Sequence, residues 1–330
     1  MRRRKVISIV GTRPEAIKMA PVIKELQKNS DAFEHLLLTT AQHREMLDQV
    51  LGLFNLAPDV DLGLMEQNQD LAAFASRSLS SLSMKLLELK PDAILIQGDT
   101  TTVMTSALAA FYQGIRVGHV EAGLRSSDRR NPFPEEINRR VASCLTDFHF
   151  APTPRARQNL LDEGISPDTV FVTGNTIVDA LESIPLDGGF EDRRIGSIDF
   201  QGRRVILVTA HRRENHGAPL RAVCHALKRL TERFDDVEVV YPVHLNPNVS
   251  QPVRSYLSSV PRIHLIDPAS YSDLLKLMSR CYLIMTDSGG IQEEAPSFHK
   301  PVLVLREVTE RPEIIEVGAG RIVGTDPDRI

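Results

Sequence analysis

The chain has 330 residues, of which 42% are hydrophobic and 25% charged, and its formal net charge is −4. This length exceeds what one hydrophobic core usually supports, so it predicts two domains of ordinary globular composition. Charges of both signs are interspersed, which argues against a nucleic-acid partner, and no apolar run reaches membrane-spanning length, which argues against a membrane protein.

The N-terminus and the cysteines indicate a cytoplasmic protein. The basic start of the chain leads directly into the apolar run 6–10, which is too short for a signal-peptide core and lacks a small-residue cleavage site. The three cysteines, Cys144, Cys224 and Cys281, lack metal-ligand spacing and fall in apolar-periodic segments. Each is therefore predicted to be a small buried side chain, and no metal site is expected.

Short apolar runs recur in chain order, separated by helical patterns such as 70–89 and 220–233. The runs cover residues 6–10, 36–39, 93–97, 117–120, 149–151, 170–173, 205–209, 237–243, 263–266, 282–285 and 302–305. They are rich in Val, Ile and Leu, which is typical of strands buried on both faces of a parallel sheet. The alternation predicts two doubly wound α/β domains.

Chain breakers at 184–189 predict the linker between the domains, which we place at 1–185 and 186–330. Near the end, 321–324 is predicted as a strand and 325–327 as a helix start, but the sequence stops at Ile330. A C-terminal helix is therefore expected to be missing.

Charged or glycine-rich segments follow five of the predicted strands. They begin at Gly11, Gly98, Glu121, Ala210 and Asp287. Because ligands of open parallel sheets bind outside the carboxyl ends of the strands, these segments predict a binding cleft between the two halves.

The segment Ser288-Gly289-Gly290 stands at a strand-to-helix turn, where glycines let the backbone approach a phosphate. Glu294, one turn later, is placed to accept from ribose hydroxyls. The alternative is a plain glycine turn with an N-cap.

Four cationic or ionisable groups could neutralise a diphosphate, namely Arg13, Lys18, His211 and Arg311. Solvated surface cations are the alternative. The positions of Arg13 and His211 directly after strands favour function, whereas the sequence around Arg311 favours neither reading. His244 ends another predicted strand and is a secondary candidate.

Carboxylates also occupy strand ends. Asp99 and Glu121 both end predicted strands of the first half and could converge as acid and base, although Asp99 could instead be a helix N-cap. Glu135 and Glu136 open a helix, where acidic residues favour the dipole in any case.

Together these segments resemble the bacterial non-hydrolysing UDP-N-acetylglucosamine 2-epimerases. The matching stretches, in chain order, are GTRPE (11–15), TAQHR (40–44), GDTTT (98–102), HVEAGLR (119–125), PEEINR (134–139), TGNT (173–176), HRREN (211–215), PVHLNP (242–247), TDSGGIQEE (286–294) and TERPE (309–313).

The resemblance implies two Rossmann-like domains facing a central cleft, as in glycosyltransferase-B-like folds. It implies reversible epimerisation of UDP-N-acetylglucosamine to UDP-N-acetylmannosamine, for bacterial cell-surface polysaccharide precursors, without nicotinamide, metal or other cofactor. UDP would be eliminated to leave a glycal intermediate and then re-added. The resemblance also implies a homodimer, and a second substrate molecule acting as an allosteric activator.

The matching positions imply residue roles. The catalytic positions would be Asp99, Glu121, Glu135 and His211, and which carboxylate is base and which is acid stays open. The UDP-binding positions would be Arg13, Lys18, Ser288, Gly289, Gly290, Glu294 and Arg311. The allosteric positions would be Gln42, Arg212, Glu214 and His244. A glycosyltransferase of the same architecture or a nucleotide-sugar sensor are the alternatives, but we see no acceptor groove in the first half, and a sensor would be expected to lack the acidic trio.

Overall fold

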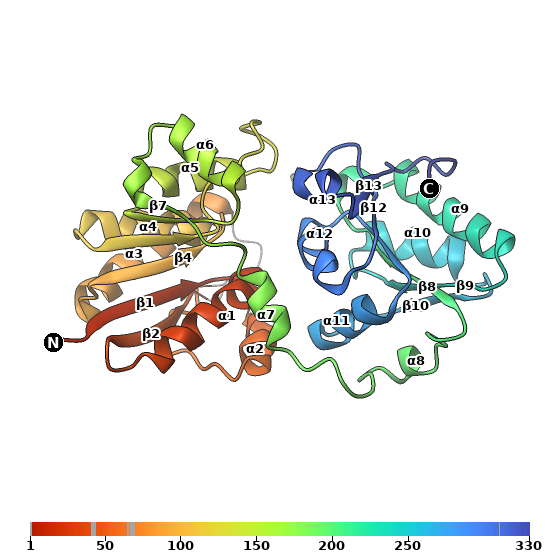
Figure 1. Cartoon of the computed structure of the whole chain (residues 1–330), viewed down its shortest axis with the longest axis horizontal. Helices are drawn as coiled ribbons and strands as arrows, with labels where there is room; N and C mark the ends of the chain where they lie inside the picture. Colours follow the sequence, from red (N-terminus) through yellow and green to blue (C-terminus); the bar gives the residue numbers. More distant parts are fainter. Residues whose placement is uncertain (1, 41–43, 65, 67–69, 310) are drawn as a thin grey trace. The chain divides into compact units, whose positions relative to one another are not determined.

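The computed structural model describes residues 2–40, 44–64, 66, 70–309 and 311–330, with the side chains of 44–46 excluded. It divides into two compact units, Met1–Ser183 and Ile184–Ile330 (Figure 1). Each unit is built around one parallel sheet.

Unit 1 holds a seven-stranded sheet of order β3-β2-β1-β4-β5-β6-β7. Its strands are β1 (Arg4–Val10), β2 (Phe33–Thr39), β3 (Val60–Asp61), β4 (Ala93–Gln97), β5 (Arg116–Val120), β6 (Phe148–Ala151) and β7 (Val170–Val172). Its helices are α1 (Arg13–Lys28), α2 (Arg44–Leu53), α3 (Leu71–Leu89), α4 (Thr101–Tyr112), α5 (Glu135–Leu145), α6 (Pro154–Asp162) and α7 (Ile177–Glu182), with η1 (Pro167–Thr169) as a 3-10 turn.

Unit 2 holds a six-stranded sheet of order β10-β9-β8-β11-β12-β13. Its strands are β8 (Arg204–Thr209), β9 (Val237–Pro242), β10 (Ile263–Ile266), β11 (Leu283–Thr286), β12 (Val302–Val304) and β13 (Gly320–Ile322). Its helices are α8 (Arg193–Gly196), α9 (Ala218–Arg233), α10 (Pro247–Leu257), α11 (Tyr271–Arg280), α12 (Gly289–Glu294) and α13 (Pro312–Glu316), with 3-10 turns η2 (Arg213–Asn215) and η3 (Ala295–Phe298).

In each sheet the chain first adds strands toward one edge and then toward the other. The change takes place between β1 and β4 in unit 1 and between β8 and β11 in unit 2. Loops diverge there at the carboxyl edge of the sheet, and this topological switch point is where doubly wound folds bind ligands. The strand orders and the parallel pairing confirm the predicted fold class of two Rossmann-like, doubly wound α/β domains.

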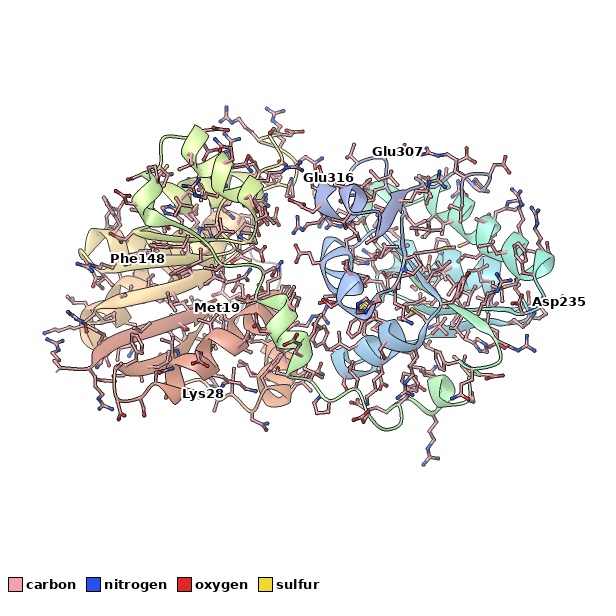
Figure 2. The ribbon with its side chains drawn as sticks, in the orientation of Figure 1. Met19, Lys28, Phe148, Asp235, Glu307 and Glu316 are labelled. Carbon is pink, nitrogen blue, oxygen red and sulfur yellow. The ribbon has the colours of Figure 1, made fainter. Side chains whose placement is uncertain are left out.

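The helices of unit 1 pack in two groups. Helix α1 contacts α2 and α7, whereas α4 contacts α3 and α5, so that the sheet is covered on both faces. Burial follows the amphipathic pattern within α1, since Met19 is fully buried and Lys28 in the last turn is exposed (Figure 2). The sheet interior is aliphatic, with Ile7, Ile94 and Val117 inaccessible to solvent.

Local sequence explains where the site-bearing helices begin. Thr12 caps α1 and forms a capping box with Glu15, and Pro14 in the first turn fits the helix because it needs no N–H partner there. Thr100 caps α4 by accepting from the Val103 N–H at 3.3 Å. The alternative reading of Asp99 as the cap of this helix is therefore wrong.

Two more expectations need correction. Cys224 and Cys281 are buried as predicted, but Cys144 is exposed, because it lies on the outer face of α5 between the buried Ser143 and the partly buried Leu145. The predicted helix start at 325–327 forms only a turn, in which the Ile330 N–H donates to the Asp326 carbonyl at 3.1 Å.

Candidate functional site

The carboxyl edge of the unit 1 sheet brings together Asp99, Glu121 and Lys18. Gln97 of β4 pairs in register with Val120 of β5, so the residues that follow these strands leave the sheet at the same level. Lys18 of α1 forms an ion pair with Glu121, and Gln97 donates to the same carboxylate oxygen at 2.9 Å. Lys18 is thus held on a proposed catalytic acid.

Glu121 has a left-handed backbone with φ of +66°. This conformation is uncommon for a residue with a side chain, and such strain concentrates at functional sites. The Glu121 side chain is only 8% exposed, so its orientation is fixed by the backbone and by its two partners.

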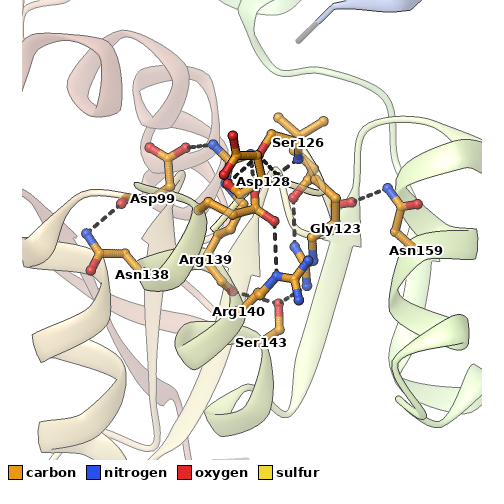
Figure 3. A network of polar contacts seen from close by, with 12 residues as sticks. Asp99, Gly123, Ser126, Asp128, Asn138, Arg139, Arg140, Ser143 and Asn159 are labelled. Atoms are coloured by element: carbon orange, nitrogen blue, oxygen red, sulfur yellow. Dashed lines mark hydrogen bonds and ion pairs between the residues drawn. The ribbon is translucent and has the colours of Figure 1, made fainter. Parts of the chain in front are cut away.

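Two polar contacts hold Asp99 itself, and a third holds the residue before it (the first two are drawn in Figure 3). Its carboxylate accepts from the Arg139 guanidinium at 2.5 Å, and its carbonyl accepts from the Asn138 amide at 3.0 Å. The preceding Gly98 carbonyl accepts from His119 at 2.7 Å, and burial lowers the pKa of His119 to about 4, so this ring is neutral at physiological pH. Helix α5 and strand β5 therefore fix the position of Asp99.

Helix α5 also carries Glu135 in its first turn. The neighbouring Glu136 is fully buried, accepts from the Ser126 N–H at 3.0 Å and pairs with Arg139 at 3.3 Å and Arg140 at 3.0 Å. Glu136 therefore has a structural role. The same helix carries Glu135 and the two residues that hold Asp99, Asn138 and Arg139.

Arg13 begins α1 and is half-buried.

Unit 2 places the backbone N–H groups of His211 and Arg212 and the side-chain amide of Asn215 around a buried carboxylate, Asp287. One oxygen of Asp287 accepts from the N–H groups of His211 and Arg212 and from the Asn215 amide, each at 2.9 Å. The other lies 3.6 Å from Nδ1 of His211. Asp287, fully buried at the end of β11, thus joins the loop after β8 to its own loop across the switch point.

The His211 ring stacks on His244, with centroids 5.3 Å apart and ring planes 12° apart. A proposed catalytic residue and a proposed allosteric residue are thus in contact. Glu214, another of the proposed allosteric residues, forms an ion pair with Arg306 at 2.5 Å. Gln42 lies outside the described residues.

Gly289 and Gly290 open α12 with open space beside them. A Cβ added at Gly289 would meet only an Arg212 guanidinium nitrogen, at 3.8 Å, and one at Gly290 only the Ser288 hydroxyl, at 3.9 Å. Neither glycine has a positive φ. Protein packing therefore does not require glycine at these positions, whereas close approach of a ligand to the backbone would.

Helix α12 also carries the predicted binding residue Glu294, and its Glu293 is the partner of another predicted binding residue, Arg311. Glu294 is buried and accepts from the Tyr271 hydroxyl at 3.0 Å. Arg311 forms an ion pair with Glu293. Both side chains are thus oriented by neighbours in unit 2, and Ser288 is the N-cap residue of the helix without a side-chain capping bond.

Sequence reasoning left out two structural acids, Glu15 and Asp287. Each had a signal in the sequence, because Glu15 is the third residue after a helix-capping threonine, and Asp287 follows a predicted strand as Asp99 does.

Among the described residues, no group of three or more His, Cys, Asp or Glu is placed to hold a metal ion, and no helix of that part is long and apolar enough to cross a membrane.

Fold and site together define a doubly wound α/β protein with hydrogen-bonded carboxylates at the carboxyl edge of one sheet and an open glycine turn at that of the other. The family model described as UDP-N-acetylglucosamine 2-epimerase matches residues 24–330. The UDP-N-acetylglucosamine 2-epimerases of Escherichia coli K12 and Salmonella typhimurium LT2 are 49% and 50% identical to the chain, covering 99% of it and 88% of each relative.

A crystal structure of UDP-GlcNAc 2-epimerase from Neisseria meningitidis bound to UDP-GlcNAc superposes with a TM-score of 0.90 at 48% identity. The match covers 98% of this chain and 89% of that one. The chain therefore belongs to the UDP-N-acetylglucosamine 2-epimerase family, and it is an isomerase of the epimerase type.

Proposed function

We propose that the protein interconverts UDP-N-acetylglucosamine and UDP-N-acetylmannosamine by elimination and re-addition of UDP. A base removes the proton from carbon 2 of the sugar while the bond from carbon 1 to the UDP oxygen breaks, leaving a glycal and UDP. UDP then attacks carbon 1 again while carbon 2 is protonated on the opposite face. The observation that carries this proposal is the gathering of acids at the unit 1 switch point in a chain of this family.

Asp99, Glu121 and Glu135 supply the proton-transfer groups in this proposal. Two opposite faces of carbon 2 need two groups, and carboxylates held by fixed partners suit general acid–base catalysis. The Arg139 bond to Asp99 and the Lys18 pair with Glu121 support this, because each orients one carboxylate. Which of these carboxylates is the base and which the acid in the forward direction stays open in the proposal.

Unit 2 binds the UDP part in the same proposal. The open turn at Gly289 and Gly290 leaves the backbone accessible to phosphate oxygens. His211 and Arg311 add positive or hydrogen-bonding groups that stabilise the departing diphosphate, together with Arg13 of unit 1. Glu294 is oriented by Tyr271 and accepts from the ribose.

A single NMR experiment tests the reaction. The protein is incubated with UDP-N-acetylglucosamine in deuterated water, and proton spectra follow the signal of the hydrogen bound to carbon 2 of the sugar. We expect loss of that signal together with appearance of the manno isomer. Retention of the carbon 2 proton in a protein that binds the nucleotide sugar would contradict the proposal.

We also infer that a second molecule of UDP-N-acetylglucosamine activates the enzyme through Arg212, Glu214, His244 and Gln42. The stacking of His244 on His211 supports this, since an activator that moves one ring moves the other. The manno-to-gluco direction, assayed with and without added UDP-N-acetylglucosamine, tests it, and activation should weaken in His244→Ala. Equal rates with and without the activator would contradict it.

The product is proposed to serve as a precursor of bacterial cell-surface polysaccharide. Deletion of the gene from its host, followed by sugar analysis of the surface polymers, tests this role. Loss of N-acetylmannosamine and sugars derived from it is expected, and restoration requires the active gene.

A further inference from the structure

Glu15 is a buried carboxylate that receives three donors from two loops. Its residue surface is 2% exposed. One oxygen accepts from the N–H groups of Gly11 and Thr12, the latter at 3.1 Å, and the other accepts from the Thr100 hydroxyl at 2.5 Å. Gly11 and Thr12 belong to the loop after β1, and Thr100 belongs to the loop after β4.

These are the two loops at the unit 1 switch point, and each carries a residue of the proposed site. Arg13 directly follows Thr12, and Asp99 directly precedes Thr100. No other described contact links the backbone turn at Gly11 and Thr12 to Thr100 through a charged group.

The packing beneath this link leaves little room for adjustment. A Cβ at Gly11 would lie 2.4 Å from the Thr102 hydroxyl and 2.5 Å from the Thr40 hydroxyl, and these two hydroxyls are hydrogen-bonded to each other at 3.0 Å. The turns after β1 and β2 and the first turn of α4 therefore meet through short polar side chains, and a small shift in one turn is passed to the next.

We propose that Glu15 is a positioning residue that fixes the Arg13 loop relative to the Asp99 loop for the reaction. The inference rests on the proposed function. Because Glu15 is buried, it acts through the loops and makes no contact with the reacting sugar. The loss of alignment matters because a displacement of about 1 Å at reacting groups lowers turnover on the order of 100-fold.

The chemistry of the link predicts which replacements preserve it. Glutamine has the same length, its carbonyl can accept from the Gly11 and Thr12 N–H groups, and its amide can donate to the Thr100 hydroxyl. Aspartate is one methylene shorter and cannot reach both loops, and alanine removes the link. Glu15→Gln therefore keeps the alignment, whereas Glu15→Asp and Glu15→Ala lose it.

Steady-state kinetics of these variants test the role. Glu15→Ala and Glu15→Asp should lower kcat by about 10- to 100-fold with a smaller change in KM, and Glu15→Gln should stay within about threefold of the wild type. Equal kcat for Glu15→Asp and the wild type, or a loss in Glu15→Gln as large as in Glu15→Ala, overturns the proposal.

Thr100→Val tests the same link without removing the buried acid. It also removes the N-cap of α4, so the matched control is Thr153→Val, which removes the comparable cap of α6, where Thr153 accepts from the Ala156 N–H at 3.1 Å. Thr100→Val should lower kcat by about 10-fold and Thr153→Val should not. In Glu15→Ala the additional effect of Thr100→Val should disappear, and full additivity overturns the proposal.

Amide hydrogen exchange separates this inference from the proposed function. Thr100→Val should accelerate exchange of the Gly11 and Thr12 amides as well as of its own loop, whether or not the protein turns over a nucleotide sugar. Faster exchange confined to residues around Thr100 overturns the positioning role. An inactive wild type with exchange coupled between the two loops would instead contradict the proposed function alone.

Discussion

The three proposed acids differ in the partners that hold them. Asp99 faces Arg139, Glu121 faces Lys18 and Gln97, and Glu135 opens helix α5. Charge-assisted hydrogen bonds are short and directional, so they fix where a carboxylate points as well as its charge. Such fixed orientations suit groups that transfer protons at one carbon atom.

Neutral isosteres of the acids should impair turnover far more than binding. We expect Asp99→Asn, Glu121→Gln and Glu135→Gln to lower kcat by about 10²- to 10⁴-fold, the usual contribution of a general acid or base, with the Kd for UDP changed by only a few fold. Turnover assays and calorimetric titration with UDP measure the two quantities. Glu238→Gln, which replaces a largely buried acid paired with His264 at 2.8 Å, is the control, and unchanged turnover in a site variant removes that residue from the catalytic group.

Glu15 should make the stability of the protein depend on pH. Burial raises the pKa of Glu15 from 4.5 to about 7, opposed by its three hydrogen bonds, and the charge of Asp99 acts in the same direction as burial. Because the folded pKa lies above the unfolded one, the proton stabilises the folded state. This contribution is complete below about pH 4.5 and is lost as the pH rises through 7.

Between pH 5 and pH 8 the free energy of unfolding of the wild type should therefore fall by up to about 3 kcal/mol relative to that of Glu15→Gln, which cannot ionise. Melting temperatures of both proteins at several pH values measure the difference. Glu25→Gln, on the exposed side of the same helix, is the matched control. A constant difference across this range would show that Glu15 does not titrate there.

At the scale of elements, strands were predictable because burial on both faces of a parallel sheet leaves continuous aliphatic runs. The bounds of β4 and β10 agree with the runs at 93–97 and 263–266. Strand β3 was missed because it has only two residues, Val60 and Asp61, at the sheet edge. The exposed face of α5 was misjudged at Cys144 because the register of a helix is set by tertiary packing.

The contacts of the site residues were less predictable than their positions. That Asp99 and Glu121 both end strands follows from the pattern, but the pairing of these strands comes from the fold, and Lys18, 103 residues away from Glu121, reaches it only through the fold. The roles of Glu15 and Asp287 were hidden because each bonds backbone N–H groups, whose directions depend on the turn.

Both units use an acidic side chain in the same place. Glu15 joins the loops after β1 and β4, and Asp287 joins the loop after β8 to that after β11. These are the switch points of the two sheets, where loops diverge and leave N–H groups without strand partners. A buried acid satisfies them and sets the spacing of two loops at once.

The loop after β5 packs closely on α6 at Gly123. Its φ is +90°, and a Cβ would lie 2.1 Å from the Ala156 carbonyl oxygen, which is backbone and cannot turn away. Gly123→Ala should destabilise unit 1 by more than about 4 kcal/mol. Gly164→Ala is the matched control, because its φ is +85° and nothing lies within 4 Å, so that only backbone strain of about 1–2 kcal/mol remains. Melting curves compare them, and equal losses would contradict the steric argument.

At the scale of the whole molecule, unit 1 presents an apolar patch on α3 and α4. Met84, Leu87, Phe111 and Tyr112 are 65%, 64%, 58% and 67% exposed. The two helices pack against each other, and the Gln113 side chain donates to the Ser83 carbonyl at 2.7 Å, which brings the end of α4 next to the middle of α3. Clustered exposed side chains of this size mark interaction surfaces more often than isolated ones do.

We propose that this α3/α4 patch is the interface of a homodimer. Met84→Glu together with Phe111→Glu would place four like charges in an isologous interface, since every substitution occurs twice about the two-fold axis. The wild type should elute as a dimer in light-scattering chromatography and the double variant as a monomer that remains folded by circular dichroism. Val317→Glu, at a residue 75% exposed in unit 2, is the control and should stay dimeric. A wild type that is monomeric at micromolar concentration, or a double variant that stays dimeric, would exclude this surface as the interface.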